Sequence, residues 1–365
     1  MAKHNAANTR IKRGYFDYLK HAQRRDEASI DQVARALTQF EQSTGHKDFK
    51  KFHIKQAVAF KTKLSEQKNA KTGKPLSRAT VHSTLSVLRA FFNWLADKPG
   101  YKSRIGYSDA DYFNLSEKDV RIAKAKREKP VPTLDQVHHV IATMPTRSDI
   151  EKRNRALIAL ALLTGARAAA LASLKMKHID LNEGCIDQDA REVNTKNSKT
   201  FKTWFCPVGG DALQIVTDWV EHLREQLLWG DDDPLFPKTL VGVGGQGGFE
   251  ALGLAREHWS GTGSIRTIYK RAFEAAGFRY YNPHCFRHSL ARLGGQICPT
   301  IEHYKAWSQN IGHENVQTTL MTYGKVPEEK QAELIRGLGE GQAESEEAQI
   351  TAIVAETMRR MRQVR

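Results

Sequence analysis

Apolar side chains recur at helical spacing through the first third of the chain. The clearest helix is predicted from Ser77 to about Leu95, with the Ser77 hydroxyl as its N-terminal cap. Its apolar stripe consists of Leu85, Leu88, Phe92 and Leu95. The same spacing predicts helices from Thr9 onward and from Asp48 to Leu64. Residues 1–120 are therefore predicted to form a small helical domain.

The pattern changes after residue 132, where helical spacing is interrupted by short strand-like runs. Helices are predicted after caps at Thr133 and Asp149, over 211–229 and 264–276, from Pro283, and around 301–307. Short strands are predicted at 178–181, 184–187, 192–194 and 201–208. The predicted fold is therefore mainly α with a small antiparallel β-sheet (α+β), and residues 133–336 form its second domain.

Two stretches lie outside these domains. Residues 121–132 combine five Lys and Arg side chains with two prolines, which predicts an extended basic linker. This linker could lie along a DNA backbone or serve as a solvated hinge. After Gly337 the composition shifts to Gly, Glu and Gln. Residues 337–365 are predicted to form a tail with a final amphipathic helix, which packs on its own subunit or contacts a neighbouring one.

Two loops invite a functional interpretation from their composition. The loop at 67–74 is basic and polar, so it suits contact with phosphates, although a solvated turn explains it equally well. Residues 242–247 match the spacing Gly-x-Gly-x-x-Gly, which binds dinucleotides within a βαβ unit. No βαβ pattern surrounds this stretch, so a flexible loop is predicted in place of a dinucleotide site.

The charge balance favours a polyanionic partner. The 365 residues include 56 Lys and Arg against 41 Asp and Glu, which gives a formal net charge of +15. Such an excess is typical of nucleic-acid-binding proteins, although some cytosolic proteins are basic without such a partner. No apolar run approaches the ~18 residues of a membrane span, and the four cysteines form no C-x-x-C pair that would indicate zinc. A cytoplasmic, nucleoid-associated protein is predicted, with no membrane contact and no metal.

Residues 282–326 concentrate side chains suited to phosphate chemistry. His284 and Arg287 are three residues apart at the predicted start of a helix, and His313 and Tyr323 follow. Arginine offers a planar fork of donors to two phosphate oxygens, and histidine can donate or transfer a proton. Tyrosine can attack phosphorus and hold it covalently until another hydroxyl displaces it. This set of side chains requires no cofactor.

With these residues placed, the chain from about residue 130 to 335 resembles the tyrosine recombinase (phage integrase) family. Residues 1–120 are similar to the helical core-binding domain of that family, which binds DNA. The motifs that carry the resemblance are Thr164-Gly165-Ala166-Arg167, His284 with Arg287, Gly312-His313, Thr318-Thr319, Tyr323, and Lys196 on a strand turn. Two positions depart from the family pattern. Ala170 stands where many members have an acidic supporting residue, and Tyr323 is ten residues after His313, where many relatives show nine.

The resemblance implies an enzyme that cleaves and rejoins DNA strands through a covalent 3′-phosphotyrosyl intermediate, without ATP. The residues that would carry this chemistry are Arg167, Lys196, His284, Arg287, His313 and Tyr323. Tyr323 would be the nucleophile, Lys196 the general acid for the leaving 5′-oxygen, and His284 the general base or proton shuttle. The two arginines and His313 would bind the scissile phosphate and stabilise its charge in the transition state.

Neighbouring residues offer alternatives for two of these roles. The general acid could instead be one of two further lysines on the same predicted hairpin, Lys199 and Lys202. The neighbouring tyrosines, which are expected to be packing residues, are Tyr280, Tyr281 and Tyr304. His288 follows Arg287 directly, but it lies outside the motif spacing and is predicted to be structural.

The resemblance also implies the partners of the reaction. These are double-stranded DNA recombination sites and a homotetramer acting on two duplexes, with DNA-bending or directionality proteins as accessory factors. The expected function is site-specific recombination, for integration or excision of a mobile element or prophage. A type IB topoisomerase-like enzyme and a non-catalytic DNA-binding protein with the same fold are the alternatives. The complete set of catalytic residue types favours an enzyme, because a pure binder does not need Tyr323.

Overall fold

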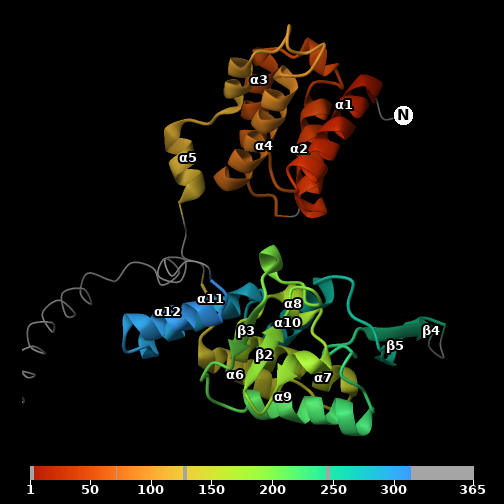
Figure 1. Ribbon diagram of the computed structural model, residues 1–365, viewed down its shortest axis with the longest axis vertical. Coiled ribbons are helices and arrows are strands. Elements are labelled where there is room, and N and C mark those ends of the chain that lie inside the picture. The colour runs from red at the N-terminus through yellow and green to blue at the C-terminus, as the bar shows by residue number, and fades with distance from the viewer. Residues whose placement is uncertain (1–3, 71, 126–129, 244–246, 314–365) are drawn as a thin grey trace, which may run out of the picture. The chain divides into compact units, whose positions relative to one another are not determined.

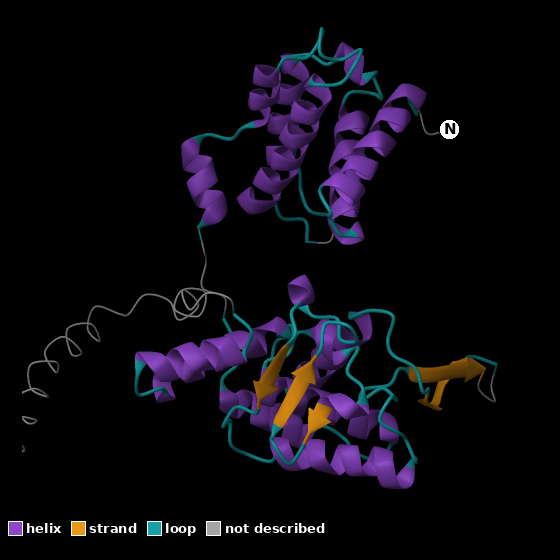
Figure 2. Ribbon diagram, in the orientation of Figure 1, coloured by secondary structure: helices purple, strands orange, loops and turns teal. Residues whose placement is uncertain are grey.

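The computed structural model describes residues 4–70, 72–125, 130–243 and 247–313. The chain divides into two compact units, Met1–Arg127 and Glu128–Arg365 (Figure 1). The first unit is helical, and the second combines helices with short antiparallel strands (Figure 2). The predicted class, mainly α with a small antiparallel sheet, is confirmed. Tyr323 and the predicted tail helix at 337–365 lie outside the described residues.

The helices of the N-terminal unit are α1 (Ala6–Asp17), α2 (Glu27–Ser43), α3 (Ile54–Glu66), α4 (Arg78–Ala96) and α5 (Glu117–Lys124). Ser77 caps α4 as predicted, because its hydroxyl accepts a hydrogen bond from the Thr80 amide. The core of the unit is aromatic, and its fully buried rings include Phe40, Phe91, Phe92 and Phe113. Each such ring contributes about 1.5–3 kcal/mol through burial. The predicted helix at 48–64 begins only at Ile54, after a 3₁₀ turn at Phe49–Lys51.

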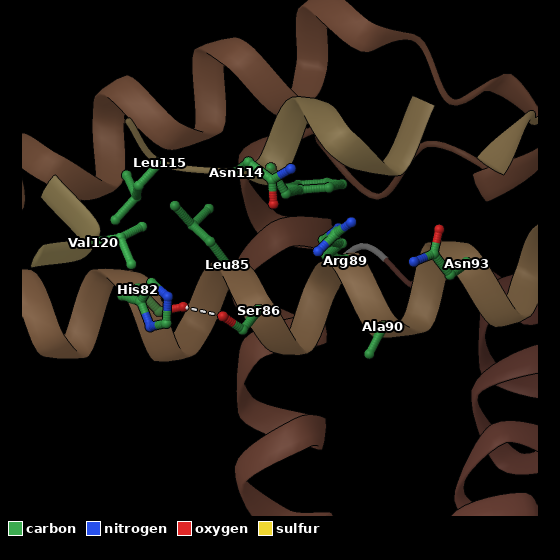
Figure 3. A pocket seen from close by; sticks show the side chains of 10 residues that line it. His82, Leu85, Ser86, Arg89, Ala90, Asn93, Asn114, Leu115 and Val120 are labelled. Carbon is green, nitrogen blue, oxygen red and sulfur yellow. Dashed lines mark hydrogen bonds between the residues drawn. The ribbon is translucent and has the colours of Figure 1, made fainter. Parts of the chain in front are cut away.

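A groove of about 430 Å³ lies on the N-terminal unit, beside α4, α5 and the residues that follow the 3₁₀ turn Tyr107–Phe113 (Figure 3). Its apolar lining includes Leu85, Leu115 and Val120. Its polar lining includes His82, Ser86, Arg89 and Asn93, which all lie on α4. The Arg89 guanidinium pairs with Asp111 at 2.8 Å, which neutralises part of the charge that this face would present. None of the predicted catalytic residues lines this groove.

The junction between the units differs from its prediction. Extended chain was expected from residue 121, but α5 continues to Lys124. The helix forms because Ser116 caps it, through a hydrogen bond to the Asp119 amide, and because Glu117 pairs with Arg121 one turn later. Residues 126–129, which make up the centre of the predicted linker, are outside the described ranges. Within those ranges, no helix combines the length and apolar content needed to cross a bilayer.

The C-terminal unit is built around α7 (Asp149–Thr164). Every residue of α7 from Ala156 to Thr164 is buried, so the helix is apolar on all sides and shows no one-sided stripe. The unit also contains α6 (Leu134–Thr143), α8 (Ala168–Leu171), α9 (Ala212–Glu221), α10 (Gly263–Ala275), α11 (His284–Ile297) and α12 (Ile301–Asn310). Thr133 caps α6 as predicted, and its hydroxyl accepts a hydrogen bond from the Gln136 amide.

Two small sheets accompany these helices (Figure 2). The first is antiparallel with the order β1 (Ile179–Asp180), β2 (Cys185–Gln188), β3 (Phe201–Trp204). The second is a hairpin of β4 (Thr239–Val243) and β5 (Phe249–Leu254), in which Val243 pairs with Phe249. The prediction of a flexible loop at 242–247 therefore missed this hairpin. Its five glycines between 242 and 248 hide the alternation that marks a strand.

Two further local predictions are wrong. Ser148 caps α7, one residue before the predicted Asp149, because its hydroxyl and the Glu151 carboxylate each accept the amide hydrogen of the other residue. Residues 192–194 do not form a strand. The amides of Glu192 and Val193 both donate to the Asp189 carbonyl, at 3.0 and 2.7 Å, and this closes a turn.

Candidate active site

Arg287 is the most deeply buried of the predicted site residues that the structure describes. It lies on the first turn of α11 and is 4% exposed. Its Nη1 donates to the Gly165 carbonyl at 3.1 Å, and its Nε donates to His313 Nε2 at 3.2 Å. Its Nη2 is buried without a hydrogen-bond partner among the described residues. Burial, followed by the charge of Arg167, lowers the pKa of Arg287 to about 9.

The turn that receives Arg287 is formed by the end of α7. Gly165 follows the helix with a φ of 59°, a left-handed conformation that glycine adopts without strain. A Cβ at this position would lie 2.9 Å from Leu290 Cδ1 of α11, so the glycine also permits close packing of the two helices. Two residues after Gly165, Arg167 lies directly before α8, and its side chain is half-buried. Burial lowers the pKa of Arg167.

His313, which follows the end of α12, also contacts Arg287. Gly312 has a φ of 66°, and the amides of Gly312 and His313 donate back to the Gln309 and Ser308 carbonyls. This helix ending directs the imidazole toward Arg287. Since Nε2 accepts from a guanidinium, the ring is neutral and carries its proton on Nδ1. Burial first, then the nearby arginines, lower the pKa of His313 to about 4.

His284 begins α11, and its side chain is exposed. Its ring lies edge-on to the ring of His288, with centroids 4.8 Å apart. The charges of both histidines also contribute to the lowered pKa of His313. Sequence reasoning set His288 aside as structural. Its spacing of four residues from His284, which places both on one helix face, was the signal for a closer relation.

Asn310, the last residue of α12, is a supporting residue that sequence reasoning missed. Its side-chain oxygen accepts from the Trp204 amide at 2.7 Å, and its side-chain nitrogen donates to the Trp204 carbonyl at 2.9 Å. The Thr203 hydroxyl donates to the Asn310 backbone carbonyl at 3.1 Å. These bonds join the end of α12, and therefore the Gly312–His313 turn, to strand β3. A side-chain contact across about 100 residues leaves no local pattern in the sequence.

Lys196 lies in the connection between β2 and β3, at a tight turn where Asn197 and Ser198 both have positive φ. Lys196 and Lys199 are exposed on either side of this turn, and Lys202 is exposed on β3. Among the described residues, no hydrogen bond or ion pair joins Lys196 to Arg167, Arg287 or His313. The structure therefore brings the arginines and histidines together, and leaves Lys196 on an exposed tip.

Tyr323 falls outside the described residues. Two of the three alternative tyrosines are part of packed surfaces. Tyr281 is 8% exposed and its ring packs edge-on to Phe273, and Tyr304 is buried on α12. Tyr280 is partly exposed, beside the start of α11.

The cluster has the chemical character of a receptor for an oxyanion. It combines two partly desolvated guanidinium groups with a neutral imidazole, and one donor nitrogen of Arg287 has no partner in the described part of the chain. Ala170, at the position of the acid that many family members have, is buried in the core. Within the described ranges, neither Arg167 nor Arg287 forms an ion pair with a carboxylate.

Comparison with known proteins gives the family. The model described as the phage integrase family matches residues 131–330, which is more than half of the chain. The chain belongs to the phage integrase family. It is thus a tyrosine recombinase, an enzyme that cleaves and rejoins DNA with a tyrosine nucleophile and without ATP, and the predicted family is confirmed.

Individual relatives agree with this assignment. The recombinase is 26% identical over 253 residues to tyrosine recombinase XerC of Lactobacillus delbrueckii subsp. bulgaricus, which covers 68% of this chain and 72% of the relative. It is 26% identical over 252 residues to tyrosine recombinase XerC of Escherichia coli O157:H7, covering 67% and 70%.

Solved structures with the same fold include a lambda integrase dimer bound to a core site. The match has a TM-score of 0.57 at 15% identity, and covers 87% of this chain and 97% of the other. The Tn1549 transposon integrase in complex with transposon right-end DNA also has a TM-score of 0.57 at 15% identity, with coverage of 90% and 99%. At these identities the likeness establishes the fold alone.

Proposed function

We propose that this tyrosine recombinase performs site-specific recombination, and that Arg167, Arg287 and His313 form the receptor for the scissile phosphate. The observation that carries the proposal is Nη2 of Arg287, which has no hydrogen-bond partner among the residues that the structure describes and is buried beside a second arginine and a neutral histidine. A buried donor without a partner is rare in proteins, and one group that could satisfy it is a bound anion. The desolvation of both arginines strengthens their attraction for such an anion.

The proposed chemistry begins with attack of the Tyr323 hydroxyl on phosphorus. Its proton passes to His284 as the bond between Tyr323 Oη and phosphorus forms. The bond from phosphorus to the 5′-oxygen breaks, and Lys196 donates a proton to that oxygen. Meanwhile Arg167, Arg287 and His313 stabilise the added negative charge on the non-bridging oxygens. The 5′-hydroxyl of another strand then reverses these steps and releases the tyrosine.

The proposed substrate is double-stranded DNA with specific recombination sites. The net charge of +15 supports a polyanionic partner, and relatives of the same fold have been solved in complex with DNA. We assign DNA binding to residues 1–120 as well as to the catalytic domain at 133–336, with a homotetramer acting on two duplexes in the cytoplasm. Integration or excision of a mobile element, aided by DNA-bending or directionality proteins, is the proposed task.

The test uses nicked duplexes tiled across the DNA that flanks the coding sequence of this chain. A nick close to the cleavage site lets the short 5′-hydroxyl strand diffuse away, so the covalent intermediate accumulates. We expect a protein–DNA band that survives a denaturing gel with the wild-type protein and is absent with Tyr323→Phe. The variant should still retard the same duplex on a native gel, because it loses only the nucleophilic oxygen.

The outcomes separate the candidate functions. An adduct followed by exchange between two duplexes establishes a recombinase, whereas relaxation of supercoils without exchange would indicate a topoisomerase. Specific binding without any adduct would indicate a non-catalytic binder and refute the proposal. An adduct that persists in Tyr323→Phe would move the nucleophile to one of the other tyrosines.

A further inference from the structure

The connection that carries Lys196 is long for a hairpin. It runs from Asp189 to Thr200 between β2 and β3, and Lys196 lies at its exposed tip. A loop of this length would leave a lysine free to sample many positions. A general acid must instead lie within hydrogen-bond distance of the leaving oxygen. The contacts at the base of the connection are therefore relevant to the acid step.

Glu192 forms two of these contacts. Its carboxylate accepts from Lys177 Nζ at 2.9 Å and lies 2.9 Å from His178 Nε2. His178 is 5% exposed, and its Nδ1 accepts the Lys175 amide at 2.9 Å. The ring proton therefore resides on Nε2 and is donated to Glu192. The charged and polar donors lower the pKa of Glu192, which keeps the carboxylate ionised as an acceptor.

The following residues connect this anchor to the arginine side of the active site. Val193 is buried in the core of the C-terminal unit. The Asn194 amide donates to the Ser173 hydroxyl at 2.8 Å, and that hydroxyl donates in turn to the Ala169 and Ala170 carbonyls of α8. Arg167 immediately precedes α8. One short segment, 192–194, thus ties the loop that carries Lys196 to the helix that begins after Arg167.

We propose that Glu192, held by His178 and Lys177, is a positioning residue for Lys196. Fixing residues 192–194 leaves only Thr195 between the anchor and the lysine, so the reach of the lysine is set by its own side chain and one backbone residue. The anchor acts on the proton delivered to the 5′-oxygen and does not touch the phosphate. This inference rests on the proposed function, in which Lys196 is the general acid.

The test compares two forms of the nicked duplex that gives the strongest adduct, one with the natural 5′-oxygen at the scissile phosphate and one with sulfur at that bridging position. A thiolate is a far weaker base than an alkoxide, so it leaves without protonation and bypasses the general acid. Single-turnover rates are measured for the wild type, Lys196→Ala and Glu192→Gln. General acids contribute roughly 10²–10⁴-fold, so we expect Glu192→Gln to cleave the oxygen substrate about 10- to 100-fold more slowly. On the sulfur substrate it should cleave at nearly the wild-type rate.

The matched control is Asp232→Asn. Glu192 also lies 3.7 Å from Lys175 Nζ, and Asp232 pairs with both Lys175 and Lys177 at 3.0 Å each, but Asp232 lies outside the 189–200 connection. We expect it to cleave both substrates like the wild type. Glu192→Asp, which retains the negative charge that pairs with Lys177 and His178, should recover part of the lost rate on the oxygen substrate.

The results distinguish failure of this inference from failure of the proposed function. Equal losses on both substrates for Glu192→Gln, with Lys196→Ala rescued by sulfur, would overturn the positioning role alone. An unchanged rate on the oxygen substrate for Glu192→Gln would overturn it as well. If sulfur does not rescue Lys196→Ala, the assignment of the acid is wrong, and the inference is wrong with it.

Discussion

Replacing Arg287 with methionine should stabilise the folded protein while it abolishes strand cleavage. The fall in the pKa of Arg287 from its ordinary value to about 9 corresponds to ~5 kcal/mol of unfavourable free energy for the charged folded state. Its two hydrogen bonds within the described residues, to Gly165 and His313, return ~3 kcal/mol at ~1.5 kcal/mol per charged donor. Methionine keeps most of the volume and removes both contributions. The free energy of unfolding of Arg287→Met should therefore rise by about 2 kcal/mol.

A second buried arginine in the same unit gives the opposite expectation and serves as the matched control. Arg153 is 2% exposed, and burial lowers its pKa to about 10, which corresponds to ~3 kcal/mol. Its guanidinium makes four hydrogen bonds, to Asn154, Pro237 and Thr239, and stacks over Trp259. These contacts are worth ~6 kcal/mol on the same scale. Arg153→Met should therefore destabilise the protein by about 3 kcal/mol.

Scanning calorimetry of the full chain at pH 7 measures both effects. For a unit of this size, Arg287→Met should raise the midpoint temperature by about 4–8 °C, whereas Arg153→Met should lower it. At Arg287, the unfolded state binds more protons than the folded state only between pH 9 and the ordinary arginine pKa, so the penalty at Arg287 is fully present below pH 9. The temperature difference should thus be constant from pH 7 to 8, above the range in which His313 titrates. A decrease for Arg287→Met as large as that for Arg153→Met would refute the reasoning.

Three further predictions concern the Gly312–His313 turn. Gly312→Ala should destabilise the protein by about 2–4 kcal/mol in urea unfolding, because the residue has a left-handed φ and the new Cβ would lie 2.8 Å from the Phe201 ring. Between pH 4 and 6.5, His313 binds more protons in the unfolded state than in the folded state. The wild type should therefore lose stability as pH falls through this range, and His313→Asn should lose less. Asn310→Ala removes two hydrogen bonds to Trp204 and should cost about 2 kcal/mol, measured by the urea midpoint; an unchanged midpoint would show that this clamp is not rigid in solution.

The helices and their starts could be predicted wherever the determining contacts are local. Ser77 and Thr133 are predicted correctly as caps because each is a hydroxyl residue directly before an apolar helical pattern, and its partner is the amide only three residues later. The apolar stripe of α4 likewise follows from spacing alone. The cap of α7 was misplaced by one residue, since Ser148 and Asp149 are both good caps and only the contact with Glu151 decides between them.

The remaining errors arise where distant contacts override local preference. Residues 192–194 resemble a strand in composition, but Asp189 closes a turn and His178 and Ser173 fix it from another element. The β4–β5 hairpin was missed because glycine carries no side chain to show a strand alternation. In both cases the local structure is stabilised by hydrogen-bond partners from elsewhere in the chain, and the adjacent sequence does not reveal these partners.

The sequence by itself determined the fold class, the family and the identity of the candidate site residues, because these depend on residue types in a fixed order along the chain. Only the tertiary structure decided how Arg287 is held, with one donor bound to the carbonyl of Gly165, one to His313, and one unpaired. It also decided that Asn310 ties the His313 turn to β3 and that Glu192 anchors the lysine loop. The physical reason is that burial and hydrogen-bond geometry depend on atoms brought together by folding from distant parts of the chain.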